Sequence, residues 1–448
     1  MQASDRSPLK AELLINPIGE LVTCPAVDVP LRGRQLGQLQ RVSDAAIAVA
    51  GGRIIAHGKS GDVLKNVVVD ANTRTIEAAG RLVSPGLIDT HTHLVFAGNR
   101  ANEFVLRTQG KTYEEIALAG GGILASVRAT REATAEELFD SARVRLARLL
   151  AHGTTTCEIK TGYGLDLETE LKLLEVILKL EHGQPIRIVP TFMAAHAVPA
   201  GESEEKYARD IVERMLPAVV KKLQASGYTT ESNPTACAWD QIAQPRCFID
   251  VFCDRGYFSV SNSRYILEAG KSAGLVPRIH ADEFVNLGAT KLAVEVGAAA
   301  ADHLLKISSE DIARLAKSST AAVILPGTSF YLNLPERAPA RSMIEAGAFV
   351  CLGSDFNPGS CCIFSLPMIL GLACLHLKMT PEEALNCLTV NAAFMLGLGK
   401  QLGQIRNGYR ADITIYDVPC LDEIAANIGW NPVAATIKDG KLVHKVEL

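Results

Sequence analysis

The chain has 448 residues, of which 48% are apolar and 21% are charged, an ordinary mixture for a globular protein with a large core. Its formal net charge is −4 at pH 7, and the sequence contains no long basic run, so the composition gives no sign of a nucleic-acid-binding surface. The start, MQASDRSPLK, lacks an apolar leader, and no run reaches eighteen apolar residues, which predicts a cytoplasmic protein. The eleven cysteines are scattered in apolar sequence, so we expect reduced thiols in the core.

Both ends of the chain have the pattern of short strands joined by tight turns. Near the N-terminus, AAIAVAGGRIIAHG places two apolar runs around Gly51 and its glycine neighbour, which predicts a β-hairpin. Near the C-terminus, RADITIYDV and AATIKDGKLVHKVEL repeat the pattern, with a turn at Asp439. We therefore expect one small β-sandwich domain built from residues 1–80 and 401–448.

The middle of the chain, residues 81–400, alternates short apolar runs with amphipathic helical stretches. One of these helices begins at a capping box formed by Thr134 and Glu137. Eight such units predict an α/β fold, a (β/α)8 barrel with a parallel sheet. Residues 224–247 interrupt the pattern with polar, aperiodic sequence, which predicts a long surface excursion at the N-terminal face of the barrel. The eight apolar runs are RLVSPGLIDTHTH, TTTCEIKTG, IRIVPTFMAAH, CFIDVFC, LVPRIHADEF, AADHLL, AVILPG and FVCLGSD.

Six potential metal ligands stand at or just beyond the carboxyl ends of these runs. In a barrel those ends converge on one mouth, where such folds place their active sites. A lone histidine there would more often be a core residue, and an HxH pair is common by chance, but several histidines together indicate a metal site. His91 and His93, two residues apart, point to the same side of an extended chain and can reach one ion. The six residues are His91, His93, His196, His280, His303 and Asp355.

PGLIDTHTH, the strand-end histidines, the later GSD and the β-rich ends resemble the amidohydrolase superfamily of metal-dependent barrel enzymes. More narrowly, six motifs in chain order resemble the branch that hydrolyses 4-imidazolone-5-propanoate to N-formimidoyl-L-glutamate in histidine degradation. This resemblance covers nearly the whole chain. The motifs are HTHLVFAGNR, EIKTGYGL, FMAAHAVP, HADEF, AADHLL and GSDFNPGS.

The resemblance implies one zinc or iron ion held by His91, His93, His280 and Asp355. The chemistry of the residues agrees, because three imidazoles and a carboxylate bind such an ion and leave a position for water. The ion lowers the pKa of that water and polarises a carbonyl. The residue types alone leave zinc, iron and nickel open.

The resemblance also implies catalytic roles around the ion. Asp355 would accept a proton or a hydrogen bond from the water. The family's counterpart of Glu283 contacts the ring and moves a proton to the ring nitrogen, whereas the alternative is a solvated loop carboxylate. His303 would orient the attacking water, the alternative being a core histidine.

Two further strand-end residues need care, since two-metal relatives use them as ligands. There, a lysine at the position of Lys160 is carbamylated and bridges the ions, and a histidine at the position of His196 binds the second ion. The branch that the sequence resembles keeps one ion. Lys160 is therefore interpreted as structural, and His196 as a substrate contact.

The remaining implied contacts lie on loops around the mouth. A guanidinium such as that of Arg100 suits a bidentate grip on a carboxylate, and the hydroxyls of Tyr163 and Tyr113 can add to it. Family members bind the propionate tail at the positions of Arg100 and Tyr163. The ring or the product would be held by Asn357, Gly359 and Ser360.

The glycines of AGGGILASVRAT lack the ending of a phosphate-binding loop, so we interpret this segment as a flexible lid over the site. Two rival functions stay open at this point. One is a related deaminase or hydantoin hydrolase, and the other is a barrel that has lost catalysis and only binds partners. The expected ligand is a small molecule with a carboxylate, with no nucleic acid and no membrane, and the expected assembly is a homodimer.

Overall fold

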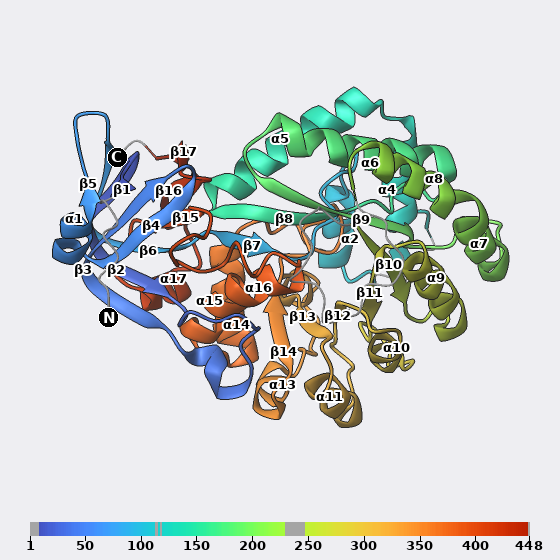
Figure 1. The fold of residues 1–448 in the computed structure, drawn as a ribbon. Coiled ribbons are helices and arrows are strands. Elements are labelled where there is room, and N and C mark those ends of the chain that lie inside the picture. Colours follow the sequence, from blue (N-terminus) through green and yellow to red (C-terminus); the bar gives the residue numbers. More distant parts are fainter. Residues whose placement is uncertain (1–8, 113–114, 117–118, 229–246, 447–448) are drawn as a thin grey trace.

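The computed structural model describes residues 9–112, 115–116, 119–228 and 247–446, and Figure 1 shows two sheets of different kinds lying side by side. One is an eight-stranded parallel sheet in the order β14-β13-β12-β11-β10-β9-β8-β7. The other is a seven-stranded sheet made from both ends of the chain. The predicted fold class, a (β/α)8 barrel with a small β-sandwich, is confirmed.

Each of the eight apolar runs forms one strand of the barrel. Parallel strands are covered on both faces, so they consist of nearly continuous apolar residues. Every residue of these eight strands is buried except Arg187 of β9, which is partly exposed. The strands are β7 (Leu87–Asp89), β8 (Thr154–Lys160), β9 (Arg187–Ala195), β10 (Phe248–Cys253), β11 (Val276–Ala281), β12 (Ala300–His303), β13 (Ala321–Ile324) and β14 (Phe349–Leu352).

Helices surround the barrel, with their ends set by local sequence. The capping box predicted at Thr134 is present, because Thr134 accepts from the Glu137 backbone and Glu137 accepts from the Thr134 backbone. A π-helical turn, η2, joins α7 to α8. The helices between β7 and β11 are α2 (Ala101–Thr108), α4 (Ile123–Glu132), α5 (Ala135–Ala151), α6 (Leu167–Gly183), α7 (Glu204–Asp210), η2 (Ile211–Met215), α8 (Leu216–Ala225) and α9 (Val260–Ser272). Those after β11 are α10 (Ala289–Val296), α11 (Ser309–Ala316), α12 (Pro326–Tyr331), α13 (Ala340–Ala346), α14 (Leu366–Leu377), α15 (Pro381–Cys387), α16 (Val390–Met395) and α17 (Leu421–Ala426).

The barrel closes just beyond the ends of its first and last strands. The backbone amide of Asp355 donates to the carbonyl of His91 at 3.0 Å, and the amide of His93 donates to the carbonyl of Phe356 at 2.9 Å. Thr92 and Phe356 form a parallel bridge between these hydrogen bonds. The seam that closes the sheet therefore carries three of the six strand-end residues.

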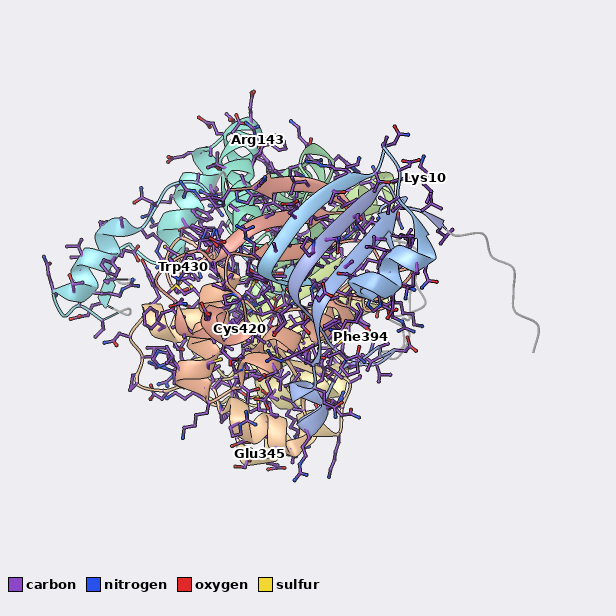
Figure 2. All side chains as sticks on the ribbon, turned by 90° about the vertical axis from the view of Figure 1, so that its left-hand side faces the viewer. Lys10, Arg143, Glu345, Phe394, Cys420 and Trp430 are labelled. Carbon is purple, nitrogen blue, oxygen red and sulfur yellow. The ribbon has the colours of Figure 1, made fainter. Side chains whose placement is uncertain are left out.

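The terminal sheet has the strand order β17-β16-β15-β6-β2-β3-β4, and Figure 2 shows the strands of the two chain ends next to one another. Its apolar core joins residues of β2 and β3, such as Ile15 and Ile47, to residues of β15 and β16, such as Ile413 and Ile437. The strands and short helices are β1 (Leu9–Lys10), β2 (Leu13–Thr23), η1 (Gly33–Gly37), β3 (Gln40–Ala50), β4 (Arg53–Lys59), α1 (Ser60–Asn66), β5 (Val67–Val68), β6 (Arg74–Pro85), β15 (Ile413–Tyr416), β16 (Val433–Lys438) and β17 (Lys441–Lys445).

Both predicted hairpin turns are present in this sheet. Gly51 and Gly52 connect β3 to β4 with φ of 56° and 72°, and Asp439 and Gly440 connect β16 to β17 with φ of 47° and 75°. Two residues with positive φ match the twist of the flanking strands. The exact domain limits stay a prediction, and β6 runs across the limit placed at residue 80.

Three further expectations meet the structure only in part. Most of the excursion at 224–247 lies outside the described residues. Ten cysteines are described, all as free thiols, and seven of them are buried. None of the described helices combines the length and apolar composition needed to cross a bilayer.

Candidate active site

Three imidazoles and one carboxylate converge at the carboxyl end of the barrel. His91 Nε2 lies 3.3 Å from His93 Nε2, and His280 Nε2 lies 3.4 Å from His93 Nε2. Asp355 Oδ1 lies 3.5 Å from His91 Nε2 and 3.7 Å from His93 Nε2. The four atoms come from the loop after β7, from β11 and from the loop after β14, three strands that are distant in sequence.

These spacings fit a metal ion. Bonds of about 2.1 Å in a tetrahedron place neighbouring ligand atoms about 3.4 Å apart. Burial lowers the pKa of both His91 and His93 well below the usual range, so both rings are neutral and carry a lone pair. The next largest contribution comes from Lys160 for His91 and from His196 for His93. When the ring protons are on Nδ1, both Nε2 lone pairs can face one ion, so the donor set is suited to a metal.

Carboxylates on the neighbouring strands fix the orientation of two of these rings. His280 Nδ1 lies 3.1 Å from Asp250 Oδ1, and His91 Nδ1 lies 3.3 Å from Asp302 Oδ2. A ring that donates its Nδ1 proton to a carboxylate keeps its Nε2 lone pair for a metal. His280 is thereby held in the tautomer that binds an ion, whereas His91 Nδ1 lies near both Asp302 and the donor Arg278 Nη2, 3.5 Å away.

Beneath the histidines lies a layer of fully buried charge inside the barrel. Lys160 Nζ lies 2.8 Å from Glu158 Oε1 and 2.8 Å from Asp250 Oδ2. Arg278 Nη2 lies 2.8 Å from Asp302 Oδ2, and Arg278 Nη1 lies 3.2 Å from Glu158 Oε1. Among the described residues, Asp250, His280 and Asp302 form another group with closely spaced ligand atoms, but Lys160 and Arg278 already neutralise its carboxylates.

The sequence analysis missed Glu158, Asp250, Arg278 and Asp302. A signal was present, since each is a charged letter within an apolar strand. Glu158 stands two residues before Lys160, and Arg278 two residues before His280, so each pair shares one face of its strand. A charge on the same face as a strand-end ligand predicts a partner inside the barrel.

Backbone strain marks the same edge of the barrel. Asp355 and His303 have φ of 53° and 75°, and Asp282 and Leu304 have φ of 52° and 63°. Left-handed backbone is costly for residues other than glycine and collects at functional sites. Thr328 donates its hydroxyl to Asp355 Oδ2, which leaves Oδ1 of that carboxylate facing His91 and His93.

Glu283 lies on the substrate side of the imidazoles. The backbone amides of Glu283 and Phe284 donate to Asp254 Oδ2 at 3.0 and 2.8 Å, which fixes the loop after β11. Glu283 Oε2 lies 3.6 Å from His303 Nε2. Burial, with the charges of Asp355 and Asp254, raises the pKa of Glu283 well above the usual range, which favours the protonated form of this side chain.

A cavity opens over the cluster, and it contains most of the residues that the sequence predicts. Five of its wall residues are apolar or aromatic side chains that the sequence analysis did not single out: Ile123, Phe252, Tyr257, Phe284 and Leu332. No spacing rule distinguishes such residues from ordinary core. The other wall residues are His93, Arg100, Tyr163, His196, His280, Glu283, His303, Asp355, Asn357 and Ser360.

Several expected substrate contacts are held tightly by neighbours. His196 stacks on His93 with ring centroids 4.7 Å apart, and its Nδ1 lies 3.0 Å from the carbonyl oxygen of Gly162. Burial lowers the pKa of His196 to about 3, so the ring is neutral. The Tyr163 ring packs beside this stacked pair, with its centroid 6.0 Å from that of His93 and 5.2 Å from that of His196.

The loop after β14 is folded around one amide side chain. Asn357 Oδ1 accepts from the backbone amides of Gly359 and Ser360, and Asn357 Nδ2 donates to the carbonyl of Asp355. Asn357 and Ser360 line the cavity, whereas Gly359 lies against the guanidinium of Arg100. Tyr113 lies outside the described residues.

The predicted glycine-rich lid begins a helix that borders the cavity. Gly122 precedes α4 with φ of 69°, and Ile123, the first residue of α4, is part of the cavity wall. This position agrees with the interpretation as a cover for the site, and its flexibility stays a prediction.

The comparisons with known proteins place this fold and site in a class. A model of the amidohydrolase family matches residues 82–443. A zinc-bound adenosine deaminase from Xanthomonas campestris shares the fold, with a TM-score of 0.71, 16% identity, and coverage of 99% of this chain and 96% of that one. A triazine hydrolase variant has a TM-score of 0.73 and 18% identity, covering 97% of this chain and 94% of the other. Fold and site define an amidohydrolase barrel with a metal-binding cluster at its mouth.

Much more similar relatives are known by sequence. An imidazolonepropionase from Herpetosiphon aurantiacus is 45% identical over 440 residues, which are 98% of each chain. One from Symbiobacterium thermophilum is 45% identical over 434 residues, covering 96% of this chain and 97% of the other. One from Rubrobacter xylanophilus is 44% identical over 434 residues, covering 96% and 98%. The chain belongs to the amidohydrolase family and, within it, to the imidazolonepropionases.

Proposed function

We propose that the chain hydrolyses 4-imidazolone-5-propanoate to N-formimidoyl-L-glutamate, a step of histidine degradation, in the cytoplasm. The observation that carries this proposal is Arg100, which is only 5% exposed and lines the same cavity as the histidine–aspartate cluster. A buried guanidinium suits a substrate carboxylate. A nucleobase or an unsubstituted hydantoin has no carboxylate to offer, so Arg100 favours a ring with an acidic tail.

We propose further that one zinc or iron ion is held by His91, His93, His280 and Asp355. When bound, such an ion acidifies a water molecule and polarises the substrate carbonyl. The pairing of Lys160 with Glu158 and Asp250 supports a single ion, because both carboxylates already engage its Nζ atom and leave it poorly placed to bridge two ions.

The protein side chains orient the substrate in this proposal. Arg100 and Tyr163 grip the propionate carboxylate, and Tyr113 is proposed to add a third contact. His196, Asn357 and Ser360 face the ring, while Gly359 leaves space for the arginine. The ring carbonyl then lies toward the cluster, with its carbon open to attack.

Three groups handle the protons. Asp355 accepts the proton that the attacking water loses, and His303 orients that water. The water oxygen adds to the ring carbonyl carbon, and the bond from this carbon to the ring nitrogen breaks. Glu283, protonated because of its raised pKa, donates the proton that the leaving nitrogen requires.

The direct test follows the loss of imidazolonepropionate absorbance with purified, metal-loaded protein. Arg100→Met should raise the Michaelis constant about a hundredfold, as expected for a lost charge-assisted pair, and change kcat far less. Hydantoin-propionate should compete with the substrate. An unaltered Michaelis constant in Arg100→Met would reject carboxylate recognition, and protein that neither contains nor responds to zinc or iron would reject the enzyme altogether.

We also propose that the chain acts as a homodimer, since two-fold dimers are the commonest assemblies of soluble proteins. Phe104 and Val105 on α2 are exposed apolar side chains suited to such a contact. Light scattering of the purified protein measures the assembly, and a monomer at micromolar concentration would reject the dimer.

A further inference from the structure

We propose that Glu103 is a positioning residue that fixes the guanidinium of Arg100 for the carboxylate of the substrate, and thereby sets the preference for a ring with an acidic tail. The inference rests on the proposed function, in which Arg100 binds that tail. It adds Glu103, which is not one of the wall residues of the cavity described above.

The Arg100 guanidinium is held from two sides. Glu103 Oε2 accepts from Arg100 Nε at 2.9 Å and lies 2.8 Å from Arg100 Nη2. On the other side, a Cβ atom added to Gly359 would lie only 1.9 Å from Arg100 Nη1. The contact of one carboxylate oxygen with two guanidinium nitrogens holds that edge of the guanidinium, and the closely packed glycine restricts its movement on the other side.

The first turn of α2 makes this contact possible. Arg100 directly precedes the helix, and Glu103 is its third residue, so the two side chains lie on one face. Glu103 is 4% exposed and Arg100 is 5% exposed, so solvent does not screen the pair. A long arginine side chain otherwise has many rotamers, and the contact removes that freedom before the substrate arrives.

The second carboxylate oxygen of Glu103 reaches the other wall of the cavity. Glu103 Oε1 accepts from the backbone amide of Gly122 at 2.9 Å. Gly122 precedes α4, and the next residue, Ile123, lines the cavity. One carboxylate therefore connects the tail-binding arginine to the glycine turn that begins the cover of the site.

Positioning differs from a purely structural role in one measurable respect. Loss of a structural contact weakens all ligands of the site alike, whereas loss of positioning weakens only ligands that carry the carboxylate. The suitable measure is tail selectivity, defined as the inhibition constant of hydantoin-propionamide divided by that of hydantoin-propionate. The two probes differ only in the group that would meet Arg100.

The experiment compares the zinc-loaded wild type with three variants. Glu103→Gln keeps the length of the side chain and an acceptor for Gly122, but it loses the charge and the ion pair with Arg100. We expect its tail selectivity to fall about tenfold, with a matching rise in the Michaelis constant and an almost unchanged kcat. Arg100→Met should abolish tail selectivity. Glu132→Gln, an exposed glutamate at the end of α4, should behave as the wild type.

The outcomes separate the inference from the proposed function. Unchanged selectivity in Arg100→Met rejects carboxylate binding by Arg100, and with it the proposed function. Lost selectivity in Arg100→Met together with unchanged or increased selectivity in Glu103→Gln rejects positioning by Glu103 alone. If Glu103→Gln does not fold, Glu103→Asp decides, because its shorter side chain keeps the charge but withdraws from Arg100, and it must also lower tail selectivity.

Discussion

Lys160 shows how one side chain decides between two kinds of metal site. Its ammonium lies within 2.8 Å of both Glu158 and Asp250, and all three side chains are fully buried. The usual alternative for a lysine at a barrel mouth, a bridging carbamate, requires a neutral amine. Here two carboxylates already engage Nζ, so the lysine is not placed to bridge two ions.

Replacement of Lys160 by Met should therefore act mainly on stability. The change leaves Glu158 and Asp250 with less neutralising charge in a fully buried layer, and we expect the free energy of unfolding to fall by about 3–5 kcal/mol. Urea denaturation of Lys160→Met and of the exposed control Lys221→Met measures the difference. A bridging role would instead make wild-type activity depend on added bicarbonate, and such a dependence would contradict the structural role.

Replacement of Glu283 should lower the rate of the reaction without disturbing the surrounding structure. Its raised pKa keeps a proton available, while its backbone is held independently by Asp254. Glu283→Gln preserves the shape but cannot donate a proton in the same way, so kcat should fall by about 10²–10⁴-fold. The content of bound metal, measured by emission spectroscopy, should stay the same, and a variant with normal kcat would exclude Glu283 as the acid.

At the scale of the elements, the hairpin of β16 and β17 attaches the terminal sheet to the barrel. Asp439 in its turn lies 2.8 Å from Arg410 Nη1 and 3.4 Å from Arg187 Nη2, at the start of β9. Burial alone would raise the pKa of Asp439, but Lys438 and Arg410 lower it to about 2. A carboxyl group whose folded-state pKa is lowered stabilises the protein above its unfolded pKa.

Asp439→Asn should accordingly lower the free energy of unfolding at pH 7 by about 1 kcal/mol, after allowance for solvent screening of this partly exposed turn. The difference between variant and wild type should shrink as the pH falls from 4 through 2, to about half at pH 3. Asp44→Asn is the control, because Asp44 also has positive φ. A difference independent of pH would mean that charge plays no part.

Strands and helices were predictable because their signals are local. Buried parallel strands appear as short apolar runs, and Thr134 with Glu137 announces a helix start within four residues. The π-helical turn at Ile211–Met215 and the left-handed backbone of His303 and Asp355 have no such signal. Packing around the site imposes those conformations against local preference. The candidate ligands stood out because histidine is rare and chemically distinctive, and the structure brings them together, whereas Asp250 and Arg278 were missed as single charged residues in apolar strands.

At the scale of the whole molecule, the ligand cluster and the closing seam of the barrel coincide. His91 and His93 follow β7, Asp355 follows β14, and backbone hydrogen bonds connect the two segments. A metal that binds these residues also joins the first strand to the last. Binding to the folded state alone raises stability by mass action.

Chelation should thus lower both activity and the unfolding temperature. With an ion at a thousand times its dissociation constant, the lost stabilisation is about 4 kcal/mol. Calorimetry with and without chelator measures it, and added zinc or iron should restore the original transition. Asp355→Asn should respond weakly to the chelator, while an equal unfolding temperature of metal-free and metal-loaded wild type would contradict a seam joined by the ion.

The order of the strands across the two sheets was beyond local sequence. Short strands at both ends predicted a shared domain, but not that β6 lies between β15 and β2. Such neighbours are set by contacts between segments more than 300 residues apart, which leave no periodic trace. The closure of the barrel through residues 91–93 and 355–356 was likewise not predictable, because it also joins segments that are distant in the sequence.

This closure has a consequence for synthesis on the ribosome. A growing chain that has emerged only as far as β13 already contains His91, His93 and His280, yet it lacks Asp355 and the strand that completes the barrel. Its N-terminal strands also lack β15, the neighbour of β6. The nascent protein therefore cannot assemble the proposed ion site until Asp355 has emerged, and it cannot finish the terminal sheet until β15, β16 and β17 have followed, so the barrel mouth is complete before the domain built from both ends.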